Sequence, residues 1–198
     1  MAGTWRDQIN FLFRFLVRPK TLGAVAPSSP DLVAALMDNM GVPEARSLAE
    51  LGPGTGVATE AIRAAKKPET PFVVVEKDEH WVGFLAERYP DLDLIHGDAS
   101  ELKTYVDARE MPPLDAVICG LPFTNFGDEL QRAILTAVVA SLKPGGAFST
   151  FAYVHSKGLP AGRRFRSLLD EFFVRVETTD TVWRNTPPAV VYRAWTAE

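Results

Sequence analysis

Two carboxylates and a run of glycines are the features of this sequence best suited to holding a ligand. Glu50 ends an apolar run, and three glycines follow it at alternate positions: Gly52, Gly54 and Gly56. Because glycine has no Cβ and adopts positive φ, the backbone there can approach a ligand closely. The helical pattern that begins at Val57 would present free amides to that ligand. Glu76 ends the next apolar run, so the arrangement suits a nucleoside held through its ribose hydroxyls.

The residue pattern of the glycine turn helps to decide which class of ligand it binds. No Lys-Ser or Lys-Thr pair follows the glycines, so the turn does not match the phosphate loop of nucleotide hydrolases. Dinucleotide-binding folds also combine a glycine-rich turn with a later acid, and an ordinary strand-to-helix turn is a further alternative. The pattern Glu-x-Gly-x-Gly-x-Gly over residues 50–56 resembles the S-adenosylmethionine (SAM) motif of Rossmann-like methyltransferases. That resemblance implies SAM as the cofactor and S-adenosyl-L-homocysteine as its product.

The segments that position these residues alternate between strand and helix patterns. After a first strand that runs into the glycine turn, short apolar runs predict strands at 72–75, 92–96, 114–119 and 147–153. Helical patterns cover 57–66, 78–88 and 130–142, and residues 143–146 are expected to form a turn. Residues 172–181 and 189–195 are expected to pair antiparallel at the sheet's edge. The alternation predicts an α/β fold with a mostly parallel, doubly wound sheet, which is the Rossmann-like fold of class I SAM-dependent methyltransferases.

Ligands of such sheets bind beyond the carboxyl ends of the strands, where candidate residues occur in this chain. By the resemblance, the turn containing Thr55 passes below the amino-acid part of SAM. The Glu76 carboxylate would accept hydrogen bonds from the ribose hydroxyls. The alternative is that the ribose contact lies one residue further along, at Lys77. Asp98 would accept a hydrogen bond from the adenine amine, with Ala99 beside the ring. The alternative for Asp98 is to cap a helix that begins just after it.

Methyl transfer is expected at the loop after the fourth strand, which contains Gly120, Leu121 and Pro122. Backbone carbonyls and the ring of the following Phe123 would hold an amine in line with the methyl group, so that catalysis is mainly positioning and desolvation. The alternative is a loop that only turns the chain. Tyr153 and His155, at the end of the fifth strand, are candidate bases. Loss of a proton from a desolvated amine to water would make a base unnecessary.

The first 20 residues show an amphipathic helical pattern with an aromatic apolar face. Its apolar side contains Trp5, Ile9, Leu12, Phe13 and Leu16, and its opposite side carries Arg14 and Arg18. This pattern is typical of a helix in a membrane interface, with packing on the protein's own core as the alternative. We therefore expect a membrane-docking helix at 1–20 and a single methyltransferase domain at 21–198. Ser29, before Pro30, is expected to cap a helix that ends near residues 40–41.

Composition restricts the class of protein and its compartment. The chain has 198 residues, enough for one core, and a net charge of −4, which suits nucleic acid poorly. Its one cysteine, Cys119, excludes an intrachain disulfide. The sequence shows no apolar run of bilayer-spanning length and no signal-peptide pattern at its start. We expect a cytoplasmic monomer, associated peripherally with the inner face of the cell membrane, without a metal or a nucleic-acid partner.

Five segments together resemble one family, the small soluble bacterial phospholipid N-methyltransferases, which are similar to the rRNA adenine dimethyltransferases. The segments are residues 18–29, 50–56, 97–99, 120–122 and 185–189. The first, whose spelling includes Pro-Lys-Thr-Leu-Gly-Ala-Val-Ala-Pro-Ser-Ser, is the most specific. The resemblance implies stepwise methylation of phosphatidylethanolamine to phosphatidylcholine at a membrane surface. It also implies that residues 21–29, including Ser28 and Ser29, fold over SAM and the lipid headgroup.

Two departures from that family, and two other functions, stay open. Phe123-Thr124-Asn125 stands where an aliphatic pair before the asparagine is more usual, and Thr186 replaces the expected leucine before Pro-Pro; both departures bear on which headgroups fit. The first other function is an rRNA adenine N6-methyltransferase. Those enzymes resemble Asn-Leu-Pro-Tyr where this chain has Gly120, and this chain lacks a basic C-terminal domain. The second is a protein that binds SAM or membranes without catalysis.

Overall fold

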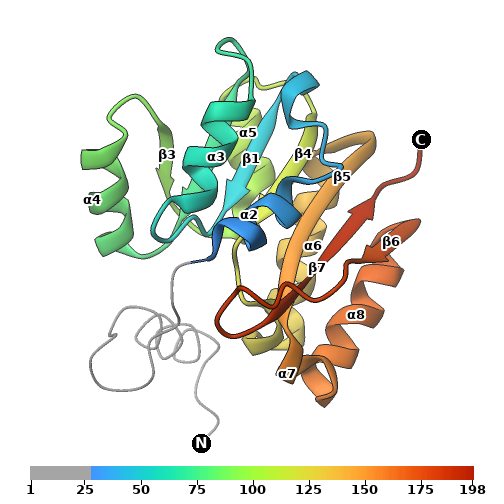
Figure 1. Ribbon diagram of the computed structural model, residues 1–198. Coiled ribbons are helices and arrows are strands. Elements are labelled where there is room, and N and C mark those ends of the chain that lie inside the picture. Colours follow the sequence, from blue (N-terminus) through green and yellow to red (C-terminus); the bar gives the residue numbers. More distant parts are fainter. Residues whose placement is uncertain (1–27) are drawn as a thin grey trace, which may run out of the picture.

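The described part of the chain, residues 28–198 of a computed structural model, is built around one seven-stranded sheet (Figure 1). The strands are β1 Leu48–Leu51, β2 Phe72–Glu76, β3 Asp93–His96, β4 Leu114–Cys119, β5 Leu142–Tyr153, β6 Arg175–Thr178 and β7 Ala189–Trp195. Their order is β3-β2-β1-β4-β5-β7-β6. The pairs among β1–β5 are parallel, and β7 is antiparallel to β5 and to β6. The predicted α/β architecture is therefore confirmed.

Helices cover both faces of this sheet (Figure 1). α2 Pro30–Met37 and α3 Val57–Ala65 pack on one face, with α4 Glu79–Arg88 beside α3; α5 Leu102–Ala108, α6 Asp128–Ser141 and α8 Pro160–Phe172 pack on the other. The short α7 Val154–Lys157 and the 3₁₀ turns η1 Val42–Glu44, η2 Ala99–Glu101 and η3 Phe123–Asn125 complete the elements. Along β4, Ile118 faces the α2 side and Val117 the α6 side, because successive strand side chains point to opposite faces. Both faces are covered, so central strands read as unbroken apolar runs.

The helix after the N-terminal region begins as the sequence predicts. The Ser29 side chain accepts a hydrogen bond from the Leu32 amide at 3.1 Å, and Pro30 occupies the first helical position. α2 then ends at Met37 instead of near residue 40, because the backbone of Asp38 is already extended (φ −64°, ψ 132°). The N-cap of α2 is therefore confirmed and its predicted end is three residues too long.

Further along the chain, one expectation is wrong, one is confirmed, and one helix was not predicted. The turn expected at 143–146 lies inside β5, where pairing with β4 shifts from Leu114↔Leu142 to Ala116↔Ala147; the Pro-Gly-Gly run forms a bulge, with Gly145 at φ 69°. β6 and β7 form the expected terminal antiparallel pair at one edge of the sheet, with β6 outermost and β7 next to β5. α8 was not predicted, because three arginines interrupt the apolar pattern to which its buried Phe165, Leu168 and Leu169 belong.

Residues 1–27 lie outside the described part of the chain. The docking-helix expectation for residues 1–20 falls there, with Trp5, Ile9, Leu12, Phe13, Arg14, Leu16 and Arg18, and it stays a prediction. Among residues 28–198, no helix has the length and apolar character to cross a membrane.

Candidate functional site

The glycine turn after β1 is bent so that its backbone closely approaches the loop after β4. Gly52, Gly54 and Gly56 all have positive φ, between 53° and 78°, a region that other residues enter at a cost. A Cβ on Gly120 would lie 2.5 Å from the carbonyl oxygen of Gly52. The backbones of these two strand ends are therefore in close contact at Gly52 and Gly120. They flank the point where strand order reverses, which is where ligands bind in such sheets.

Gly54 is the open position of that turn. A Cβ added there would meet no atom within 4 Å, whereas one on Gly52 or Gly56 would clash with the side chains of Leu121 or Leu85. The half-buried Thr55 follows it. The top of the turn is therefore free for a ligand, and its two flanking glycines are fixed by packing.

Glu76 organises the turn from the end of β2. One carboxylate oxygen accepts hydrogen bonds from the amides of Lys77 and Asp78, at 2.8 and 2.9 Å. The other accepts one from the Gly54 amide at 3.1 Å. The side chain is buried, and this burial raises its pKa, against the lowering effect of the three amide bonds. A carboxylate has about four acceptor positions, so Glu76 joins the glycine turn to β2 and retains acceptor capacity.

Glu50 lies beneath the turn. Its carboxylate accepts a hydrogen bond from the Thr59 hydroxyl at 2.7 Å, which ties the first turn of α3 to β1. Burial raises the pKa of Glu50 to about 8; the Thr59 bond opposes this and the nearby Glu76 charge adds to it. Glu50 is therefore a protonated, neutral group at pH 7. It supports the turn from below.

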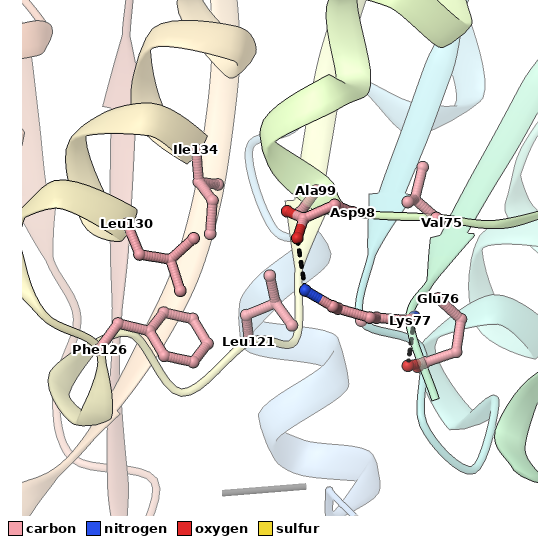
Figure 2. Close-up of a pocket in the computed structure, with 11 residues that line it drawn as sticks. Val75, Glu76, Lys77, Asp98, Ala99, Leu121, Phe126, Leu130 and Ile134 are labelled. Atoms are coloured by element: carbon pink, nitrogen blue, oxygen red, sulfur yellow. Dashed lines mark hydrogen bonds and ion pairs between the residues drawn. The ribbon is translucent and has the colours of Figure 1, made fainter. Parts of the chain in front are cut away.

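Lys77 and Asp98 bridge the ends of β2 and β3. The Lys77 ammonium lies 2.6 Å from the Asp98 carboxylate (Figure 2). The other oxygen of Asp98 accepts hydrogen bonds from the amide and the hydroxyl of Ser100. Asp98 therefore caps η2, which confirms the alternative expectation of a helix cap at this residue. Burial opposes ionisation, but the Lys77 and Ser100 bonds hold the Asp98 pKa below its usual value. Asp98 is thus an ionised acceptor at neutral pH.

A pocket opens between these charged groups and the first turns of α6. Its walls are Gly52, Val75, Glu76, Lys77, Gly97, Asp98, Ala99, Leu121, Phe126, Leu130 and Ile134. Figure 2 shows Leu121 between the two sides, with the Lys77–Asp98 ion pair on one side and Phe126, Leu130 and Ile134 on the other. Apolar walls with two carboxylates at one edge suit a flat heteroaromatic ring that carries polar substituents. The residues present therefore fit an adenosine group.

The loop after β4 is arranged differently from the expectation in one respect. Phe123 is fully buried and stacks on Phe165, with ring centroids 4.6 Å apart, so it cannot offer its face to an amine. Phe126, three residues later, lines the pocket instead. The sequence reading missed Phe126, Leu130 and Ile134, although their spacing of four along the start of α6 was a usable signal. The carbonyls of Leu121 and Pro122 each accept one backbone hydrogen bond, from Phe123 and Asn125, and keep a second lone pair.

Tyr153 is at the end of β5 and packs with the residues on the α2 side of the sheet. Its ring stacks on that of the exposed His155, with centroids 5.6 Å apart. Burial raises the pKa of Tyr153 to about 12. The phenol is therefore protonated at neutral pH and donates hydrogen bonds, which argues against its expected role as a base.

Two segments far apart in the sequence meet beside Tyr153. The Ser29 amide donates a hydrogen bond to the side-chain oxygen of Asn185 at 2.9 Å, across 156 positions. The Asn185 side-chain nitrogen donates to the Pro187 carbonyl at 2.7 Å. Ala189, which follows this segment, pairs with Tyr153. The structure thus brings half-buried Ser28 and Ser29 to the carboxyl end of β5, at the same edge of the sheet as the glycine turn.

The arrangement can bind a nucleoside and hold a second molecule next to it. In the part of the chain that the structure describes, no three His, Cys, Asp or Glu side chains form a group that could hold a metal ion. Cys119 is buried, and burial raises its pKa to about 12, so the thiol is not a nucleophile at neutral pH.

Comparison with curated proteins gives one relative of matching length. An ornithine lipid N-methyltransferase from Singulisphaera acidiphila is 32% identical over 190 residues, which is 94% of this chain and 95% of that protein. Ribosomal RNA small subunit methyltransferase A from Hydrogenobaculum sp. is 27% identical over 60% of this chain. Its probable counterpart from Thermococcus gammatolerans is 26% identical over 66%. The chain spans about half the length of these two RNA methyltransferases. No protein-family profile matches the chain.

Solved structures share the fold. N-methyltransferase NodS from Bradyrhizobium japonicum, in complex with S-adenosyl-L-homocysteine, has a TM-score of 0.65 at 14% identity over 97% of this chain and all of that one. The O-methyltransferase TomG from Streptomyces achromogenes, in complex with SAM, has a TM-score of 0.66 at 17% identity over 100% and 91%. The architecture is thus that of the Rossmann-like methyltransferases.

Proposed function

The chain belongs to the class I SAM-dependent methyltransferases, in one family with the ornithine lipid N-methyltransferase, and on that premise we propose that it methylates the amine of a membrane-lipid headgroup. The observation that carries the proposal is the match to that relative over 94% of the chain. Ser29 and Asn185, which are hydrogen-bonded to each other, lie near the carboxyl end of β5. Substrate choice is assigned to this part of the molecule.

Phosphatidylethanolamine is the first proposed substrate, methylated in steps through mono- and dimethyl forms to phosphatidylcholine. The resemblance of residues 18–29 and 185–189 to phospholipid N-methyltransferases supports it. Ornithine lipid is the second candidate, because the full-length relative bears that name and ornithine also ends in a primary amine. Thr186, which departs from the phospholipid pattern, lies next to Asn185 where the two segments meet.

The cofactor-binding residues that we propose all lie at the carboxyl edge of the sheet. They are Ser28, Ser29, Glu50, Gly52, Gly54, Thr55, Gly56, Glu76, Lys77, Asp98, Ala99 and Gly120. The open side of Gly54 would lie beneath the amino-acid part, and Glu76 has remaining acceptor capacity for ribose hydroxyls. Asp98 would share its charge between Lys77 and the adenine amine. Glu50 would act from below by fixing the turn.

SAM, when bound, supplies a methyl group already activated on a sulfonium. The chain's own task is then to orient the acceptor amine and to remove water from it. Gly120, Leu121 and Pro122 would hold the amine through backbone carbonyls, and the apolar Phe126 and Leu130 would exclude water. Desolvation favours the neutral amine by lowering its pKa, so its proton leaves to water. Tyr153, as a protonated phenol, would orient the headgroup by donating a hydrogen bond.

Membrane association completes the proposal. Residues 1–20 would dock on an anionic membrane surface at the cytoplasmic face, with a monomer as the active form. The apolar and basic pattern of these residues supports this assignment.

An RNA adenine N6-methyltransferase is the alternative function, supported by the partial matches to ribosomal RNA methyltransferases. The close backbone contact between Gly52 and Gly120 argues against RNA methylation. An asparagine at position 120, as in those enzymes, would place a Cβ 2.5 Å from the Gly52 carbonyl oxygen in the present backbone. The net charge of −4 also opposes a large RNA partner.

Methyl-labelled SAM tests the proposal directly. Purified protein is incubated with vesicles of phosphatidylethanolamine and phosphatidylglycerol, with vesicles that contain ornithine lipid, or with ribosomal RNA. Labelled lipid is expected, and the products show which headgroup is accepted and how many methyl groups are added. Label in RNA alone, or in neither substrate while SAM binds, would overturn lipid methylation.

A further inference from the structure

Large apolar side chains that stay exposed are few in the described residues, and two of them lie at the edge that carries the pocket. Trp183 is 73% exposed and Leu159 is 53% exposed. Trp183 belongs to the β6–β7 loop, residues 179–188, and Leu159 precedes α8; both follow the carboxyl ends of strands. Val174, at 71%, lies at the opposite edge, before β6 begins. Tryptophan is seldom so exposed without a partner.

Hydrogen bonds fix the β6–β7 loop that carries the exposed Trp183. The amide of Val182 donates to the Ala189 carbonyl at 2.8 Å, and the Asn185 amide donates to the Val182 carbonyl at 3.3 Å. The Asn185 side chain adds the bonds to Ser29 and Pro187 described above. These bonds close the loop below its tip. The exposure of Trp183 is therefore a consequence of an ordered loop and not of a missing contact inside it.

The loop tip also carries positive charge. The Arg184 side chain is 86% exposed, and its nearest acid, Asp31, is 3.9 Å away with half of its side chain exposed. Asp31 belongs to α2, and Asp180 is the one acid of the loop itself. An exposed indole next to an exposed guanidinium is the pair of groups that lies at the headgroup level of a bilayer, with the ring toward the acyl chains and the cation at the phosphates.

A second segment extends this surface. The Val154 amide donates to the Pro188 carbonyl at 2.9 Å, which places the start of α7 beside the end of the β6–β7 loop. From there to the first turns of α8, the residues around Leu159 in sequence include His155, Lys157 and Arg163, with no acidic residue between positions 154 and 169. Arg164, which follows them, lies 3.9 Å from Asp128 of α6. In Figure 1 α7 and the start of β7 lie at the same end of the molecule, the end at which β1 finishes.

We propose that Trp183, Arg184 and Leu159 form a second membrane-docking surface, within the folded domain, that seats the carboxyl edge of the sheet on an anionic lipid bilayer. The proposal rests on the lipid substrate proposed above and adds the orientation. An amine at the bilayer surface then faces the loop after β4, and the molecule does not depend on residues 1–20 alone to present its site. The occupant is a bilayer because apolar and cationic groups alternate there over two segments.

Vesicle co-sedimentation of the full chain tests this surface without reference to turnover. The vesicles contain equal parts of phosphatidylethanolamine and phosphatidylglycerol, with phosphatidylcholine vesicles for comparison. We expect Trp183→Ala to lower partition about tenfold through lost apolar contact. Arg184→Gln is expected to lower it about fivefold, and this second effect should vanish in 0.5 M salt. Val174→Ser and Arg46→Gln, exposed apolar and cationic changes at the opposite edge, should stay within about twofold of the wild type.

Three results would overturn the docking surface. One is wild-type partition that neither Trp183→Ala nor Arg184→Gln lowers more than the two controls do. The second is equal wild-type binding to phosphatidylcholine and to anionic vesicles, and the third is no vesicle binding at all. The labelled-SAM assay on detergent-dispersed lipid is run in parallel. If no lipid is methylated there by the wild type, the proposed function fails while the partition data still decide the docking surface.

Discussion

The two halves of the sheet hold their functional groups in different ways. In the β1–β3 half, Glu76 is fixed by the next two amides along the chain and by Gly54, 22 positions away. In the β4–β7 half, Ser29 and Asn185 meet across 156 positions, and Arg193 of β7 donates to the carbonyl of Ala35 across 158. The first half is a set of strand-end turns, each readable by itself. The second exists only when α2 has docked on β7.

From this difference we propose that the β1–β3 half binds the cofactor common to many methyltransferases and that the β4–β7 half selects the substrate. Turns built from local bonds keep their geometry when the rest of the chain changes, so they suit a group common to many methyltransferases. A site assembled from distant segments changes with any of them, so it suits a group that varies between relatives. The changes below test this division, from the largest expected effect to the smallest.

Gly120→Ala is expected to damage both halves, because it lies on the seam between them. The new Cβ would lie 2.5 Å from the Gly52 carbonyl oxygen, and backbone must move to relieve it. Overpacking of this kind lowers the free energy of unfolding by about 1–3 kcal/mol. A displaced loop after β4 should lower methyl transfer by about 100-fold. Urea denaturation and labelled-SAM turnover measure the two effects.

Gly83→Ala is the matched control. Gly83 is in α4 and its added Cβ would meet no atom within 4 Å, so stability should rise by up to about 1 kcal/mol. Wild-type turnover by Gly120→Ala would show that the two strand ends need not touch.

Glu76→Gln should weaken SAM binding about 10- to 100-fold, since a hydrogen bond to a charged acceptor contributes about 1.5–3 kcal/mol. It also loses the carboxylate that fixes the Gly54 amide. Calorimetric titration with S-adenosyl-L-homocysteine gives the dissociation constant. Glu79→Gln, at an exposed acid three residues later, should leave it unchanged. Equal affinities in the two variants would remove Glu76 from the cofactor site.

Glu50→Gln should change how stability depends on pH. The Glu50 pKa is about 8 in the folded chain against an ordinary value of 4.5. Between these values the folded state keeps a proton that the unfolded state releases, so the contribution of Glu50 is full below pH 4.5 and is lost as pH rises to about 8. Relative to wild type, the variant's free energy of unfolding should therefore increase from pH 5 to pH 8, by about 1.4 kcal/mol per pKa unit at most.

Urea titrations at several pH values test this, with Glu129→Gln, an exposed acid, as the control. A difference from wild type that stays constant with pH would mean that Glu50 is already ionised in the folded protein.

Asn185→Ala tests the second half alone. It removes the acceptor for the Ser29 amide and the donor to the Pro187 carbonyl, which should cost about 1–3 kcal/mol of stability for a buried pair. KM for lipid should rise several-fold while affinity for S-adenosyl-L-homocysteine stays within about twofold. Asn185→Asp keeps the acceptor for the Ser29 amide, so its KM for lipid should lie between those of the wild type and Asn185→Ala. Equal losses in lipid KM and cofactor affinity would contradict the division between the halves.

Tyr153→Phe is expected to have the smallest effect. A phenol with a pKa of about 12 does not accept protons at neutral pH, so the shape of the pH–rate profile should not change. Turnover should fall by about threefold or less through one lost hydrogen bond. Loss of the limb on which the rate rises with pH would restore Tyr153 as a base.

Much of the β1–β3 half could be predicted because its signals are local. The positions of Glu50, Gly52–Gly56, Glu76 and Asp98 at strand ends follow from apolar runs and turn residues, and the structure places them together. The bulge at 143–146 was misread as a turn, because Pro-Gly-Gly marks a bend without saying whether the strand continues beyond it. Phe123 and Phe126 are alike in composition, and only packing decides that the first is core and the second lines the pocket.

The sequence alone determined the α/β class, the glycine turn at 52–56 and the cap at Ser29, because each depends on the conformations of a few neighbouring residues. The tertiary structure decided the order of β7 within the sheet, the bond between Ser29 and Asn185, the pKa values of Glu50 and Tyr153, and the exposure of Trp183. Pairing partners, burial and electrostatic environment depend on which distant segments come together. No short stretch of sequence contains that information.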